Sequence, residues 1–256
     1  MSQATVPRTL ALNDDQIATF DTEDVTPSMW SAVLDHLRSD FPEGRFRFVD
    51  LGGGNGLFAD RILEAFPESS GVVYDRARLL LDRNRVNRRK RIVEGSIEDS
   101  GRVLTGERFE VVFFNWVLHH LVTGTWRGTE SAQARALADA SGLLSPGGRV
   151  SVIENFYEGI VFSDLPGRLI FAATSSKLLA PVTRRLGANT AGVGVAFRSR
   201  ADWRRVLARV GLHSESPFED FIWRTSFAKR ALLHIAQVRA GHLWCRPDSE
   251  YRSART

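Results

Sequence analysis

The chain has 256 residues, of which 43% are hydrophobic and 25% are charged, a balance that indicates one globular domain rather than disorder. Its single cysteine, Cys245, excludes a disulfide framework, a cysteine-rich zinc site and a three-cysteine cluster. The start of the chain lacks the pattern of a secretory signal, and no apolar stretch approaches the length of a membrane span. We therefore expect a cytoplasmic protein without a membrane partner and, since no acidic triad is evident, without a metal ion.

Residues 1–44 form an N-terminal lead-in. Within it, residues 28–40 predict a helix whose apolar face carries Trp30, Val33 and Leu37. The helix either packs on a sheet or folds over a ligand site, and the sequence leaves both open.

Residues 48–60 predict a buried strand that ends in glycines and then opens an amphipathic helix. Glycine is needed where the chain turns sharply or where backbone approaches a ligand, because a Cβ would clash in both places. The helix presents free N–H groups and its positive dipole end at the same point. The stretch therefore predicts a ligand-binding site.

Two kinds of ligand fit this turn. Residues 54–59 match the dinucleotide fingerprint G-x-G-x-x-A, and Asp75 lies near the spacing of an acidic ribose partner, as in NAD-dependent oxidoreductases. However, Asp50 precedes Gly52-x-Gly54-x-Gly56, a run that resembles motif I of class I S-adenosylmethionine (SAM) methyltransferases. An acid at this point would repel a pyrophosphate and suits the cationic aminoacyl end of SAM. The resemblance implies that this motif contacts the cofactor through Asp50, Gly52, Gly53, Gly54 and Gly56.

The next two strands are expected at residues 71–75 and 91–94. By the same resemblance, Asp75 accepts both ribose hydroxyls of SAM, with Arg76 beside it, because a carboxylate offers two oxygens to two donors. The loop after the third strand holds adenine in the family, here through Ser96 and Ile97. Ser96 replaces the aspartate that is common at this position in the family.

The fourth strand, residues 109–115, leads into residues 116–121. This stretch resembles the family's motif at which the chain passes the methyl group of SAM, so Asn115 and Trp116 are expected at the cofactor. No Asp/Asn-Pro-Pro-aromatic run follows, which argues against amino methylation of adenine or glutamine. Without a cysteine here, 5-methylation of pyrimidines through a thiolate is also disfavoured.

Residues 116–119 resemble the Trp-x-x-His run of small-molecule O-methyltransferases, in which the histidine is the general base. Histidine suits that role because its pKa lies near working pH. His119 is therefore the candidate base and His120 a second candidate. The alternative is that these histidines only pack in the core or orient the loop.

A helix is predicted over residues 129–144, followed by an L-x-P-G-G turn at residues 144–148 and a fifth strand that ends at Glu154. This turn resembles the family's motif ahead of strand five and is not expected of a NAD dehydrogenase, so the chain is identified as a member of the class I SAM methyltransferases. Glu154 ends its strand on the same edge as Asp75 and Asn115, because parallel strands share their carboxyl ends. It either orients a substrate or His119, or caps the next turn.

Residues 155–197 interrupt the alternation of strands and helices and predict an apolar helical lid over an acceptor pocket, or a dimer surface. Residues 198–256 complete the core. They begin with a Ser199-x-x-Asp202 capping box, and two antiparallel strands are expected at residues 217–223 and 240–245.

The densest basic run, residues 83–91, is of the kind that binds phosphates or RNA. It falls where the second helix of the sheet is expected, and no aromatic residues interleave it for base stacking. We interpret it as a solvated helix face and expect no nucleic-acid partner.

The resemblance covers residues 45–245, with the SAM-binding core at residues 45–154. It implies an α/β fold with a Rossmann-like, seven-stranded, mostly parallel sheet, helices on both faces and a helical lid insertion. It also implies transfer of a methyl group from SAM, which leaves S-adenosylhomocysteine (SAH), to a small aromatic or polyketide-like acceptor, on oxygen, in natural product biosynthesis. The alternatives are an N- or C-methyltransferase of a small molecule, an RNA or protein methyltransferase, a non-catalytic SAM-binding protein and a NAD-dependent oxidoreductase. A homodimer is possible, and the sequence determines neither the acceptor nor the oligomeric state.

Overall fold

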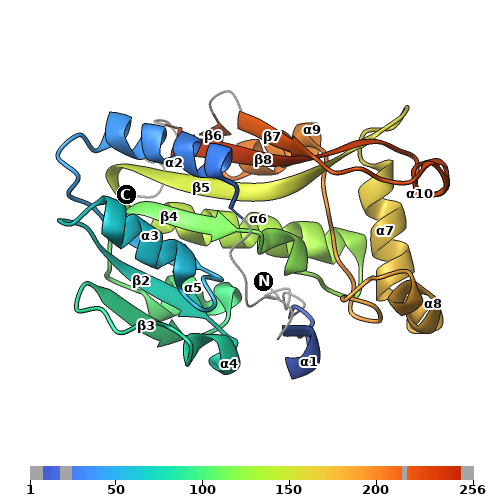
Figure 1. The fold of residues 1–256 in the computed structure, drawn as a ribbon, viewed down its shortest axis with the longest axis horizontal. Helices are drawn as coiled ribbons and strands as arrows, with labels where there is room; N and C mark the ends of the chain where they lie inside the picture. Colours follow the sequence, from blue (N-terminus) through green and yellow to red (C-terminus); the bar gives the residue numbers. More distant parts are fainter. Residues whose placement is uncertain (1–7, 18–24, 215–217, 249–256) are drawn as a thin grey trace, which may run out of the picture.

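The structure is a computed structural model that describes residues 8–17, 25–214 and 218–248. A β-sheet lies between two layers of helices (Figure 1). The strands are β1 Arg47–Leu51, β2 Ser70–Asp75, β3 Lys90–Glu94, β4 Phe109–Asn115, β5 Leu144–Gly159, β6 Leu212–Ser214, β7 Phe218–Ile222 and β8 Ile235–Pro247. The α-helices are α1 Asp14–Ile17, α2 Pro27–Asp40, α3 Leu57–Ala65, α4 Arg78–Leu81, α5 Ser100–Val103, α6 Trp126–Gly142, α7 Leu165–Ser175, α8 Ala180–Arg185, α9 Arg200–Arg209 and α10 Phe227–Leu232. Two 3₁₀ turns, η2 Ile97–Asp99 and η3 Leu118–His120, follow β3 and β4.

The strand order is β3-β2-β1-β4-β5-β8-β6, with β7 also paired to β8. The strands from β1 to β5 pair in parallel, and β8 runs antiparallel to β5. This arrangement confirms the predicted Rossmann-like, mostly parallel sheet. The described residues form eight strands rather than seven, because β6 and β7 occupy one edge position and pair with successive parts of β8.

Successive side chains of the sheet enter two separate cores, as the two-residue period of a strand requires. Phe48 packs with the apolar faces of α2 and α3, whereas Val49 and Leu51 pack with α6 and α9. Both faces of the central strands are therefore covered by helices, which explains their nearly continuous apolar sequence.

The predicted second helix is largely missing, and the basic run does not lie on a helix. The helix α4 ends at Leu81, and β3 begins only at Lys90. Arg89 instead donates to the backbone carbonyls of Leu63, Phe66 and Ser69, at and just beyond the end of α3. Lys90 is buried in an ion pair with Asp60, with 2.6 Å between Nζ and Oδ1. The prediction of a helix is therefore wrong, although Arg83, Arg85 and Arg88 are exposed as expected. The last part of the run, Arg89 and Lys90, instead contacts α3.

The segment predicted to form a helical lid, residues 155–197, begins with a strand rather than a helix. Residues 155–159 continue β5 in antiparallel pairing with β8, and helices α7 and α8 follow only after Asp164. The L-x-P-G-G segment is likewise part of β5, with a register shift against β4 between Phe109 and Val111. In the described part of the chain, no helix is both long and apolar enough to cross a membrane.

Candidate active site

The turn between β1 and α3 depends on glycines with left-handed backbone. Gly52 has φ of +83°, and a Cβ there would collide with the side chain of Val117. Gly56 has φ of +73° and precedes the first turn of α3, and a Cβ there would collide with Asn84. A residue with a side chain is sterically unfavourable in this conformation. At these positions the turn therefore presents backbone atoms without side chains.

Asp75 lies at the end of β2, beside this turn. Its Oδ1 accepts the N–H of Ala77 at 2.7 Å, and its Oδ2 accepts the N–H of Gly54 at 3.1 Å. Burial raises the pKa of Asp75, although these backbone hydrogen bonds and the charge of Arg76 oppose the rise. A carboxylate has about four acceptor positions, so Asp75 keeps capacity for a ligand hydroxyl.

Asp50 and Asn115 meet on the neighbouring strands β1 and β4. Asn115 Nδ2 donates to Asp50 Oδ1 at 3.3 Å, and the Asp50 side chain is almost fully buried. Asn115 Oδ1 is buried and finds no hydrogen-bond partner among the described residues. The carboxylate and this carbonyl oxygen make a patch of negative potential that suits a cationic group.

Trp116 directly follows the end of β4, and its backbone is strained. Its φ is +53°, a region that costs a non-glycine residue on the order of 1–3 kcal/mol and that clusters at functional sites. Its N–H donates to the carbonyl of Ile153 at 2.9 Å, which anchors the turn to β5. Its indole Nε1 is buried without a hydrogen-bond partner in the described part of the chain.

These residues line one cleft at the carboxyl ends of β1, β2 and β4. Its empty volume, including the part open to solvent, is about 990 Å³, which is large enough for a nucleoside-sized ligand. The sequence-predicted residues that line it are Asp50, Gly52, Gly53, Gly54, Asp75, Arg76, Asn115, Trp116 and His120. The other predicted site residues, Gly56, Ser96, Ile97, His119 and Glu154, are not among those that line it.

Ser96 and Ile97, predicted to hold adenine, are engaged elsewhere. Ser96 Oγ donates to Glu98 Oε2 at 3.3 Å, and its carbonyl accepts the Tyr74 hydroxyl at 2.8 Å. Ile97 is buried in the core. The apolar wall of the cleft is instead formed at this end by Ala77 and Leu80.

The N-terminal lead-in supplies residues of the cleft that the motifs did not reveal. Leu12, Ile17 and Val25 line it. The segment is attached where Leu10 N–H donates to the carbonyl of Val122 at 2.8 Å and Thr9 donates to Glu98. In the sequence these three residues stand out as apolar side chains within a polar lead-in. That pattern predicts that they are buried, but it does not predict that they lie at the cleft.

His119 and Glu154 form a buried pair directly behind the cleft. His119 Nδ1 lies 2.6 Å from Glu154 Oε2, and the His119 backbone N–H donates to Oε1 at 3.2 Å. The side chains are only 8% and 1% exposed. A carboxylate at Nδ1 favours the tautomer with the proton on Nδ1 and leaves the lone pair on Nε2. Glu154 thus contacts His119 through both of its carboxylate oxygens.

His120, the second candidate base, lines the cleft. Its ring centroid lies 4.1 Å from that of His119. Burial lowers the pKa of His120 well below its usual value, and the charges of His119 and Arg76 lower it further. The neutral ring is thus the form present at neutral pH.

A polar network holds the segment 196–198 against the His119 turn. Gln133 is fully buried; its Nε2 donates to the carbonyl of Leu118 at 2.9 Å, and its Oε1 accepts Arg198 Nε at 2.6 Å. Phe197 between these contacts stacks on Tyr157 at 4.4 Å and lies 4.9 Å from the His119 ring. The candidate base therefore has an aromatic wall on one side.

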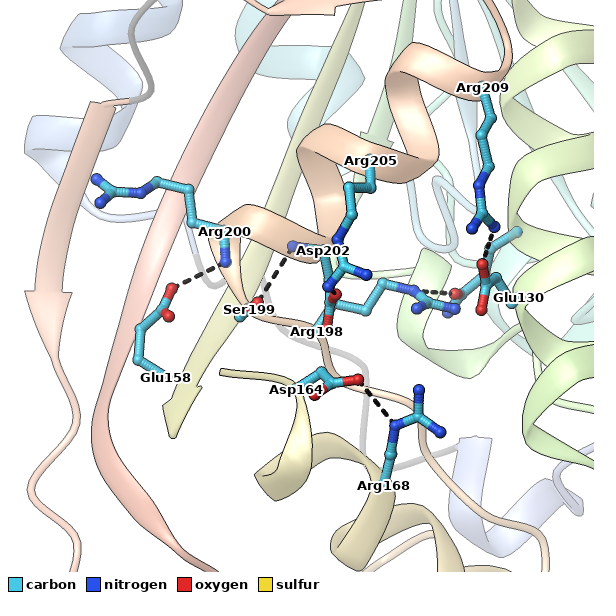
Figure 2. Close-up of polar contacts among 11 residues, drawn as sticks. Glu130, Glu158, Asp164, Arg168, Arg198, Ser199, Arg200, Asp202, Arg205 and Arg209 are labelled. Atoms are coloured by element: carbon cyan, nitrogen blue, oxygen red, sulfur yellow. Dashed lines mark hydrogen bonds and ion pairs between the residues drawn. The ribbon is translucent and has the colours of Figure 1, made fainter. Parts of the chain in front are cut away.

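Arg198 also joins the start of α9 to the helices around it, as Figure 2 shows. Its guanidinium lies over the rings of Trp126 and Trp203, and burial lowers its pKa. Arg168 of α7, paired with Asp164 at 2.8 Å, covers the same Trp126 ring. The Trp126 ring thus contacts both Arg168 of α7 and Arg198, and it links α7 to the core.

The helix α9 begins as the sequence predicts. Asp202 N–H donates to Ser199 Oγ at 3.1 Å, which confirms the N-terminal cap (Figure 2). An ion pair between Arg205 and Asp202 lies within this helix, and one between Arg209 and Glu130 links it to α6.

Residues 49–150 match the family described as a methyltransferase domain. The comparison with curated proteins found no match. Similar solved structures include LepI in complex with SAM, with a TM-score of 0.56 and 16% identity over 89% of this chain and 51% of LepI. The mitomycin 7-O-methyltransferase MmcR gives a TM-score of 0.51 and 19% identity over 90% of this chain and 60% of its own. CalO1, a methyltransferase in calicheamicin biosynthesis in its SAH-bound form, gives 0.50 and 18% over 86% and 55%.

At these identities the solved structures show a shared fold, and the chain spans only 51% to 60% of their lengths. The matched sequence, residues 49–150, runs from β1 into β5 and contains most of the residues that line the cleft. Residues 49–150 of the chain therefore resemble a methyltransferase domain, and its mostly parallel, Rossmann-like sheet is the fold that it shares with these solved structures.

Proposed function

We propose that the chain binds SAM in the cleft and transfers its methyl group to the oxygen of a small aromatic or polyketide-like acceptor, with SAH as the product. The observation that carries the proposal is the convergence of two carboxylates, Asp50 and Asp75, on the bare glycine turn. A dinucleotide would place a pyrophosphate close to Asp50, where like charges repel.

The residues of the cleft fit such a cofactor. Asp75 would accept the ribose hydroxyls, and Asp50 with Asn115 Oδ1 would hold the cationic amino group. Asn115 Oδ1 and Trp116 Nε1, both buried without partners among the described residues, each offer a contact that folding alone does not satisfy. When bound, the cofactor supplies an electrophilic methyl group on a positively charged sulfur. The adenine contact of Ser96 and Ile97 stays a prediction.

The proposed base is His119. With Glu154 on its Nδ1, the imidazole would take the proton of an acceptor hydroxyl at Nε2. The stacked pair Phe197 and Tyr157 beside it offers a flat surface for an aromatic acceptor. Orientation and exclusion of water would supply the rest of the rate enhancement.

The names of the similar structures support an oxygen acceptor and a natural-product substrate. MmcR is named a mitomycin 7-O-methyltransferase, and CalO1 a methyltransferase in calicheamicin biosynthesis. These substrates are theirs, and the class of acceptor reaches this chain only as a proposal. The cytoplasmic location and the homodimer stay predictions.

The first experiment is calorimetric titration of the protein with SAH, run beside NADH. We expect micromolar binding of SAH and none of NADH, and the reverse result would contradict the proposal. Asp75→Ala should weaken SAH binding by roughly tenfold or more, because it removes the carboxylate oxygens that would accept hydrogen bonds from the ribose hydroxyls. The matched control is Asp82→Ala, an exposed aspartate on the same connection.

The acceptor is then sought among phenolic compounds, with mass spectrometry to detect the added methyl group. A product that releases methyl iodide on ether cleavage with hydrogen iodide would place the methyl group on oxygen. An RNA or protein acceptor would instead show binding that falls steeply with salt.

A further inference from the structure

Exposed apolar side chains gather at the end of the molecule where α7, α8 and α10 lie (Figure 1). Of fifteen exposed large hydrophobic side chains in the described residues, nine lie on three segments at this end. We call them the apolar end: Ile160, Val161, Phe162, Leu178, Leu179, Val182, Leu186, Phe227 and Leu232. A clustered apolar surface of this kind marks an interaction site.

Specific contacts hold the three segments together. The backbone N–H groups of Val161 and Phe162 both donate to His234 Nε2, at 3.0 and 3.3 Å. Lys229 Nζ reaches the carbonyl of Leu186 at 3.5 Å, which links α10 to the end of α8. The turn 160–162 is therefore fixed by a side chain from the α10 segment, and its apolar residues are held in solvent.

Two features of the apolar end are unfavourable for the stability of the isolated chain. His234 has φ of +56°, a strained conformation for a histidine. The helix α10 buries none of its six residues, so packing within its own chain stabilises it little. Phe227 is 85% exposed and Leu178 is 92% exposed. Both features indicate that another surface covers this end.

The charges around the apolar end identify that surface. Segments 176–187 and 223–234 contain no acidic residue and carry six exposed basic residues, Lys177, Arg184, Arg185, Arg224, Lys229 and Arg230. Two copies of the chain facing each other here would bring these like charges together, which is unfavourable. Apolar side chains ringed by lysine and arginine match the boundary between headgroups and acyl chains of an anionic bilayer.

We propose that the apolar end docks reversibly on an anionic phospholipid surface. The apolar side chains enter the acyl boundary, and four of the basic residues, Lys177, Arg184, Arg185 and Arg224, face the lipid phosphates, whereas Lys229 and Arg230 bond to backbone carbonyls of the protein. Such peripheral contact needs no membrane-spanning helix, and it differs from the sequence-based expectation that the protein has no membrane partner. It is also independent of the reaction proposed for the cleft.

The test is co-sedimentation of the full chain with vesicles of phosphatidylcholine, alone or mixed with phosphatidylglycerol. We expect binding to the mixed vesicles, weaker binding to the neutral ones, and a loss of roughly tenfold or more in the double variant Phe227→Ser, Leu178→Ser. Both positions are exposed, so the variant should fold, and unchanged SAH binding checks this. The control is Val86→Ser, which changes a fully exposed apolar residue within the other basic segment, between Arg85 and Arg88.

Three results would overturn the proposal. The first is an absence of binding to the mixed vesicles. The second is equal loss in the Val86→Ser control, which would mean that exposed apolar side chains beside basic residues matter wherever they lie, and that the apolar end is not the specific docking site. The third is binding unaffected by the double variant, accompanied by loss of a dimer in light scattering, which would assign this end to a second copy of the chain.

Discussion

His119 and Glu154 are held together by two contacts, one from the imidazole Nδ1 and one from the His119 backbone N–H. The two residues lie 35 positions apart, on the turn after β4 and within β5. Because these strands are neighbours in the sheet, the pairing of β4 with β5 sets the orientation of the ring. The carboxylate thereby fixes the ring plane and the tautomer together.

We expect His119→Ala to lower kcat for methyl transfer by about 10²–10⁴-fold while SAH affinity stays unchanged, because general-base catalysis contributes about that much. Glu154→Gln should lower kcat by about tenfold or more, since the tautomer is no longer fixed. The control is His213→Ala, an exposed histidine. Unchanged turnover in His119→Ala would assign this histidine to packing alone.

Gly52→Ala tests the close packing of the glycine turn. We expect a loss in unfolding free energy of about 1–2 kcal/mol for the left-handed backbone, plus about 1–3 kcal/mol for the collision with Val117, and weaker SAH binding. Gly106→Ala is a matched control, because it has the same φ of +83° and nothing near its Cβ position. Equal losses of stability in urea unfolding of both variants would show that the Val117 contact does not matter.

Gln133→Leu tests the network behind the His119 turn. The change leaves the buried Arg198 guanidinium without its nearest acceptor, so we expect a loss of about 1.5–3 kcal/mol in urea unfolding. Arg168→Ala removes a half-exposed partner of Asp164 and should cost no more than about 1 kcal/mol. If Gln133→Leu lost less unfolding free energy than Arg168→Ala, the contact between Gln133 and Arg198 would not stabilise the fold as proposed.

The fold should lose stability in mild acid through His242. Burial lowers the pKa of His242 to about 3, with a further contribution from the charge of His36. The unfolded histidine has a pKa of about 6.5. Between these values the unfolded state binds a proton that the folded state does not, so stability falls as pH drops through this window, by up to about 1.4 kcal/mol per pH unit.

His242→Gln should flatten that pH dependence, measured as urea unfolding at several pH values between roughly 4 and 7. The glutamine amide of this variant can replace the hydrogen bond between His242 Nε2 and Ser151 Oγ, which measures 2.9 Å. His213→Gln serves as the control, because that side chain is 68% exposed. Burial also lowers the pKa of His120. His120 therefore accounts for part of the pH dependence of the unfolding free energy that remains in His242→Gln.

The sequence by itself was sufficient for the features that depend on near neighbours along the chain. The strand, glycine turn and helix at residues 48–60, the carboxylates Asp50 and Asp75, and the cap at Ser199 were all predicted and are present. Each rests on local rules, since left-handed backbone, capping and the carboxyl ends of parallel strands leave a signature in a few adjacent residues.

The tertiary structure decided which distant residues meet. Glu154 behind His119, Val117 against Gly52, and Leu12 over the cleft are contacts between segments far apart in the chain. The sequence pattern placed the basic run on a helix that is not there, because it could not show that Arg89 and Lys90 are used to close and anchor α3. Such contacts follow from the packing of whole layers, in which burial of apolar faces outweighs local propensity, and so no short stretch of sequence contains them.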